Sequence, residues 1–187
     1  MPRWREWFGG RSTDPRAAAY VAVLCEEPSS DDVDWLAAYA TQGDTDHARW
    51  ELRYARRAVG LLAAQRDALD DQTASLVASE LTRAVHRDPQ VAANKRSVAE
   101  QQFTARLRAY GDALLNRESG ESTSARLGRV LLGFAGHRAQ ASAALLEQAG
   151  EVIARYRADA NGALRAHFGV AALPEDVAPS ALRPGLR

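Results

Sequence analysis

Three side chains near position 47 have the types and the spacing of a metal site. Asp44, His47 and Glu51 lie in the stretch GDTDHARWELRYARRA, residues 43–58. Their separations of three and four residues would place all three on one face of a helix. Imidazole and carboxylate groups arranged in this way could hold zinc, iron or manganese. The stretch is therefore a candidate metal site centred on His47 and Glu51.

The start of a helix offers a second interpretation of the same residues. Asp44 follows Gly43 and could be an N-cap, whose side chain accepts a hydrogen bond from the backbone. Asp46 would then lie in the first turn, where the helix dipole stabilises an anion. Metal sites in helical bundles usually draw ligands from two helices, and His137 is the candidate for the second one. Beside the apolar stripe of its own helix, however, a single histidine is more often a hydrogen-bonded core or boundary residue. We expect capping and salt bridging, with metal binding as the alternative.

Large aromatic side chains and arginines follow directly after this group. They are Trp50, Arg53, Tyr54, Arg56 and Arg57. Arginine could bind carboxylates between helices or bind a polyanion. Acidic residues lie among the arginines, and 24 basic residues balance 24 acidic ones in the whole chain. The sequence therefore favours salt bridging over nucleic-acid binding, and any function of the stretch is expected in this block, as an interaction surface.

The first residues of the chain form a second candidate interaction segment. Trp4, Trp7 and Phe8 would share one face of a helical turn, with three arginines around them. Such a cluster could fold back on the rest of the chain, dock a partner protein or lie in a membrane interface. Peripheral membrane association through this segment is therefore a further alternative function.

The sequence lacks the common motifs of nucleophilic catalysis and of phosphate binding. It contains no Gly-x-Ser-x-Gly motif and no phosphate-binding glycine loop. Cys25 lies in an apolar run without a histidine nearby, which indicates an inert thiol. As the only cysteine it can form no intrachain disulfide, so we expect a cytoplasmic protein. A non-enzymatic protein without a cofactor is favoured, although an enzyme is not excluded.

The elements that would position these residues are all helical. Asp14 and Pro15 begin a short helix that ends before Pro28. A second short helix, capped by Ser30, ends at Gly43. Together they are expected to form an N-terminal helical hairpin.

Three long helices are predicted after the hairpin, over residues 44–87, 90–117 and 122–168. The pair Asp70–Asp71 could mark a kink or a new N-terminus within the first, but the flanking pattern favours a continuous helix. Apolar residues recur every seven positions along the first of them: Ala48, Ala55, Leu62, Leu69 and Leu76. Helices of this length must pair to bury a face. We predict an elongated antiparallel bundle, coiled-coil-like for part of its length.

The chain is expected to have three regions: an N-terminal Trp/Arg segment (1–12), a helical-bundle domain (13–169) and a flexible, proline-containing tail (170–187). The favoured function is an interaction or scaffold protein that presents long helical faces to a protein partner or to a second copy. The first alternative is a metal-binding helical-bundle protein or enzyme centred on His47 and Glu51. Nucleic acid is an improbable partner, and a membrane surface is a candidate only through the N-terminus.

Overall fold

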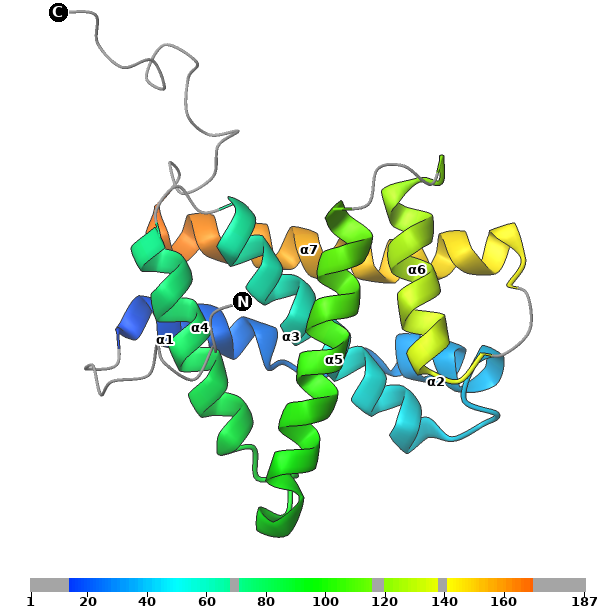
Figure 1. Cartoon of the computed structure of the whole chain (residues 1–187), viewed down its shortest axis with the longest axis horizontal. Helices are drawn as coiled ribbons and strands as arrows, with labels where there is room; N and C mark the ends of the chain where they lie inside the picture. Colours follow the sequence, from blue (N-terminus) through cyan, green and yellow to red (C-terminus); the bar gives the residue numbers. More distant parts are fainter. Residues whose placement is uncertain (1–13, 68–70, 116–119, 138–140, 170–187) are drawn as a thin grey trace, which may run out of the picture.

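The computed structural model describes residues 14–67, 71–115, 120–137 and 141–169, and within these ranges all regular secondary structure is helical (Figure 1). This confirms the all-α class. The helices are α1 (Pro15–Leu24), α2 (Ser30–Tyr39), α3 (Thr45–Asp67), α4 (Asp71–His86), a 3-10 turn η2 (Ala93–Lys95), α5 (Arg96–Leu115), α6 (Thr123–Phe134) and α7 (Ala143–Phe168). The predicted segments 1–12 and 170–187 lie outside the described residues.

The two short helices begin as their sequences indicate but do not pair. Asp14 caps α1 by accepting the backbone N–H of Arg16 at 2.8 Å. Ser29, and not the predicted Ser30, caps α2 and accepts the N–H of Asp32 at 3.1 Å. The main contacts of α1 are with α4 and α7, whereas α2 packs on α3. The predicted hairpin is therefore wrong: its two helices pack on different neighbours (Figure 1).

Two of the three predicted long helices are each divided into a pair of helices. Residues 44–87 form α3 and α4, which pack against each other, and residues 122–168 form α6 and α7, which do the same. In the second pair, Gly136 adopts a φ of 91° just after α6, and Ser142 caps α7 by accepting the N–H of Leu145 at 3.2 Å. The seven-residue repeat of residues 44–87 carries no information about whether the helix axis continues, and its member on α4, Leu76, is only partly buried.

The longest described helix, α7, has 26 residues. The structure therefore does not confirm an elongated bundle of three long helices, and a coiled coil stays a prediction. No helix in the described ranges combines the length and the apolar character that a membrane crossing requires.

Helix α3 is the centre of the fold. It contacts the other six α-helices, and all of residues 51–60 are buried. Leu52, Ala55 and Val59 belong to the core, as the apolar repeat predicts. Because neighbours surround this central part of α3, the polar residues within 51–60 are buried as well, and each needs a partner from another element.

Candidate functional site

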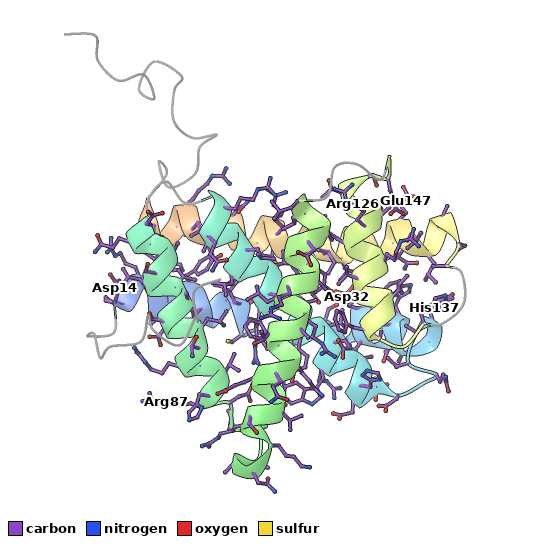
Figure 2. The ribbon with its side chains drawn as sticks, in the orientation of Figure 1. Asp14, Asp32, Arg87, Arg126, His137 and Glu147 are labelled. Atoms are coloured by element: carbon purple, nitrogen blue, oxygen red, sulfur yellow. The ribbon has the colours of Figure 1, made fainter. Side chains whose placement is uncertain are left out.

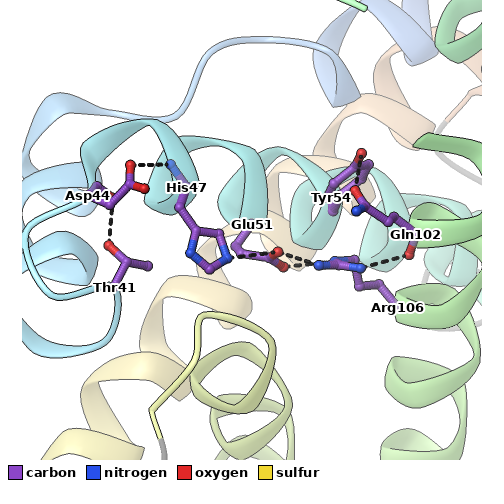
Figure 3. Close-up of polar contacts among 7 residues, drawn as sticks. All are labelled: Thr41, Asp44, His47, Glu51, Tyr54, Gln102 and Arg106. Atoms are coloured by element: carbon purple, nitrogen blue, oxygen red, sulfur yellow. Dashed lines mark hydrogen bonds and ion pairs between the residues drawn. The ribbon is translucent and has the colours of Figure 1, made fainter. Parts of the chain in front are cut away.

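Asp44 caps the helix that carries the candidate metal ligands (Figure 3). Its Oδ1 atom accepts the backbone N–H of His47 at 2.9 Å, and its own carbonyl accepts the hydroxyl of Thr41 at 2.5 Å. Asp44 is therefore the N-cap of α3, as the capping interpretation of the sequence predicts, and its side chain satisfies a backbone donor in the first turn.

Glu51 is buried and paired with an arginine. Only 4% of its side chain is exposed, and Arg106 of α5 donates to both of its oxygens, through Nε at 2.8 Å and through Nη2. His47 Nε2 lies 3.5 Å from Oε1 of the same carboxylate. Within the described ranges, no three or more His, Cys, Asp and Glu side chains are grouped so that they could hold a metal ion.

Arg106 joins three helices at this point. Its guanidinium carbon lies 4.9 Å from the ring centroid of Tyr54 on α3 and 4.5 Å from that of Phe134 on α6. Its Nη1 donates to the carbonyl of Gln102 at 3.1 Å, and the Gln102 side chain accepts the hydroxyl of Tyr54 at 3.2 Å (Figure 3). Burial raises the pKa of Tyr54, so its hydroxyl is a donor here. The cluster is saturated by its own partners.

Arg53 fixes two connecting segments on the surface of α3. It donates to both oxygens of Glu27, which follows α1, and to Oε1 of Gln90, which follows α4, at 2.5 Å. Its guanidinium carbon also lies 4.9 Å from the ring centroid of Trp50. The ring centroids of Trp50 and Tyr54 are 5.7 Å apart. The hydrogen bond from Arg53 lowers the pKa of Glu27 and keeps its carboxylate ionised.

Arg56 and Arg57 pair with carboxylates from three further places in the chain. Arg56 Nη2 lies 2.7 Å from Glu26 and 3.4 Å from Asp159 of α7. Arg57 Nη2 donates to Asp88 at 2.8 Å, and both side chains of this pair are only 6% exposed. Burial alone would raise the pKa of Asp88. The hydrogen bonds that it accepts from Arg57 and from the backbone of Gln90, together with the charge of Arg57, outweigh burial and lower this pKa.

The carboxylates that follow α1 are in an electrostatically unfavourable place. Glu26 and Glu27 lie just beyond the C-terminal end of α1, where the helix dipole is negative, and the last turn of α1 has no basic residue. Arg56 and Arg53 compensate these charges from α3. The neighbouring Cys25 is partly buried, and burial raises the pKa of its thiol, in agreement with an inert role.

The predicted interaction residues of α3 face inward. Arg53, Tyr54, Arg56 and Arg57 are buried, and Trp50 is partly buried. Their role in binding a partner stays a prediction, but in this conformation they do not present an exposed arginine face. Trp4, Trp7 and Phe8 lie outside the described residues.

His137 lies near the end of α2 (Figure 2). Its Nδ1 is 3.0 Å from the carbonyl oxygen of Tyr39. His137 is therefore hydrogen-bonded to the backbone, which agrees with the interpretation that the sequence favoured over a metal ligand. His47 lines a separate pocket of about 250 Å³ with Thr41, Gln42 and Gly136.

An open groove runs between α1 and α7, with charged groups at one end. Its volume is about 360 Å³. The lining residues are Val23, Glu26, Arg56, Asp159, Gly162, Ala163, Ala166 and His167. Val23 and the small residues of α7 make the apolar part, and the Glu26–Arg56–Asp159 group makes the charged end. We call this feature the α1–α7 groove.

Sequence reasoning missed the carboxylate partners of the arginines. Glu26, Glu27, Asp88 and Asp159 are 30, 26, 31 and 103 residues from the arginines that bind them. No local spacing indicates such pairs. The one available signal is that three arginines occur among apolar residues of a predicted core helix, because buried arginines need carboxylate partners.

Comparison with known proteins gives no match: no family model, no curated protein and no solved structure is significantly similar to this chain.

Proposed function

We propose that this protein is a non-enzymatic interaction or scaffold protein that presents a charged helical surface to a protein partner or to a second copy of itself. The observation that supports the proposal is the way in which buried arginines fix exposed carboxylates. The side chains of Glu26, Glu27 and Asp159 are 59%, 55% and 51% exposed, while those of Arg53 and Arg56 are 4% and 9% exposed. Groups held in this way lose little conformational freedom when a partner binds.

The shape of the α1–α7 groove supports a protein partner over a small substrate. Small-molecule sites usually enclose most of the ligand surface. This groove is shallow and open, with an apolar part made by Val23 and alanines of α7. At its charged end Glu26 and Asp159 share Nη2 of Arg56, so one negative charge exceeds the local positive charge. A basic side chain of a partner protein suits such a surface.

Charge neutralisation at the groove tests the proposal. Full-length protein carrying Glu26→Gln with Asp159→Asn should lose self-association in light scattering, or lose its captured partner after cross-linking. Glu151→Gln, at an exposed position of α7, is the matched control and should change neither. A strictly monomeric mass together with no partner captured by the intact protein would count against the proposal.

Metal binding at Asp44, His47 and Glu51 is a weaker proposal, because the oxygens of Glu51 already accept hydrogen bonds from Arg106. Elemental analysis of the purified protein and of His47→Ala distinguishes the two functions. Stoichiometric metal that is lost in the variant would favour the metal site.

Membrane association through Trp4, Trp7 and Phe8 is a third proposal. It predicts liposome binding by the intact chain that is lost when residues 1–11 are deleted. We also propose a cytoplasmic location, which rests on the single cysteine. Fractionation of cells that produce the protein tests it.

A further inference from the structure

We propose that the α1–α7 groove is the docking site for the N-terminal segment of the same chain, with aromatic side chains of WREWF (residues 4–8) on its apolar part and an arginine at its charged end. The inference rests on the proposed function only in treating the groove as a docking surface. It identifies the groove's first occupant, which a partner would have to displace.

The groove and the segment match in shape and hydrophobicity. Val23, Gly162 and Ala166 leave open space on this face: a Cβ atom added at Gly162 would meet nothing within 4 Å. The volume of about 360 Å³ is enough for an aromatic side chain. Trp4, Trp7 and Phe8 are large apolar groups, and covering an aromatic ring on the groove would remove apolar surface from water.

The charges match as well. The charged end of the groove has two carboxylates, of Glu26 and Asp159, on one guanidinium nitrogen of Arg56. Residues 1–13 contain three arginines and one glutamate. The C-terminal residues 170–187 have two acidic and two basic residues and no aromatic side chain, so they match the groove less well.

The segment is long enough to reach the groove. The described chain begins at Asp14, the N-cap of α1, and Val23 is nine residues further on, about 13 Å along the helix axis. The seven residues from Trp7 to Asp14 span up to about 23 Å when extended. Gly9 and Gly10 lie within this stretch and allow the backbone conformations that a change of direction requires.

Disulfide trapping in the full chain tests the proposal. In a Cys25→Ser background, Glu6→Cys is combined with Gly162→Cys, which lies in the groove. The matched control combines Glu6→Cys with Ala22→Cys, an exposed position of α1 that does not line the groove. Mild oxidation followed by peptide mapping should give an intramolecular disulfide about tenfold faster with Gly162→Cys than with Ala22→Cys. Adding Trp4→Ala and Trp7→Ala should abolish this preference.

Three results would overturn the proposal. They are equal trapping rates at the two positions, no trapping at either position, and a preference that survives the two tryptophan substitutions. A disulfide between two chains, formed in proportion to protein concentration, would show that the groove receives a second copy and would also overturn it. Trapping requires no partner, so its failure leaves the partner-binding test of the proposed function unaffected.

Discussion

Removing the charge of Asp88 should destabilise the protein strongly. Asp88→Asn keeps the shape of the side chain and an oxygen for the N–H of Gln90, which Asp88 accepts at 3.0 Å. It leaves Arg57, whose side chain is 6% exposed, without a carboxylate at 2.8 Å. Breaking a buried ion pair by removing one partner costs about 3–5 kcal/mol. This is a large part of the roughly 5–15 kcal/mol that holds a typical domain folded.

Chemical and thermal denaturation followed by circular dichroism measure the loss of unfolding free energy and the decrease in Tm. For a chain of this size, 3–5 kcal/mol corresponds to a decrease in Tm of about 6–20 °C. Glu121→Gln is the control, because the Glu121–Arg129 pair is exposed, with 57% of the Arg129 side chain accessible, and such pairs contribute about 0–1 kcal/mol.

Replacing both members of the buried Arg57–Asp88 pair separates the attraction between the two charges from the cost of leaving one of them buried and unpaired. Arg57→Met with Asp88→Leu removes the unpaired charge as well as the attraction, so this double variant should be more stable than Asp88→Asn. If Asp88→Asn loses no more stability than Glu121→Gln, buried charge pairing on α3 does not hold the α4–α5 connection, and our account of this helix is wrong.

Three further predictions concern close packing, acid and the arginine cluster. Gly128→Ala should lower the free energy of unfolding by about 1–3 kcal/mol through overpacking, because the added Cβ would lie 2.5 Å from the carbonyl oxygen of Leu146. Gly133→Ala is the control: its Cβ would enter open space, so thermal melts should show a neutral or stabilising effect. The pKa values of Glu27 and Asp88 are lowered in the folded state. Their contribution to stability is therefore present above about pH 4 and is lost as the pH falls through the folded pKa values. Denaturation measured as a function of pH should show a weaker loss of stability in acid for Asp88→Asn than for the unmodified protein. Glu51→Gln should destabilise by about 3–5 kcal/mol, because it leaves the bound arginine of α5 buried and uncompensated; an unchanged denaturation midpoint would contradict this.

The position of the arginines on α3 explains why the fold and the candidate site are one network. Arg53, Arg56 and Arg57 each bind a carboxylate or amide from a segment that connects other helices, and Arg56 also binds Asp159 of α7. The α1–α2 connection is held through Glu26 and Glu27, and the α4–α5 connection through Asp88 and Gln90. Substitution of the exposed Glu26 or Glu27 will therefore change stability and surface charge together.

The sequence by itself determined the helical class and several of the helix ends. Asp14, Asp44 and Ser122 begin helices as predicted, and α7 ends at Phe168. These features depend on side chains that bind a backbone group two or three residues away, so local chemistry is sufficient. The apolar repeat likewise identified which face of α3 is in the core.

Only the tertiary structure decided where the chain reverses and which charges meet. The apolar pattern favoured two continuous helices where the chain forms two helix pairs. The pair Asp70–Asp71 indicated a possible new N-terminus, and α4 begins at Asp71, but this local signal did not decide between a continuous helix and a break. The partners of Arg53, Arg56 and Arg57 are 26 to 103 residues away. Local rules act over three or four residues, whereas ion pairs at such separations depend on how the helices pack. For the same reason, an arginine block that looks like an exposed surface in the sequence is inside the folded protein, and its exposed counterpart is the set of carboxylates that it binds.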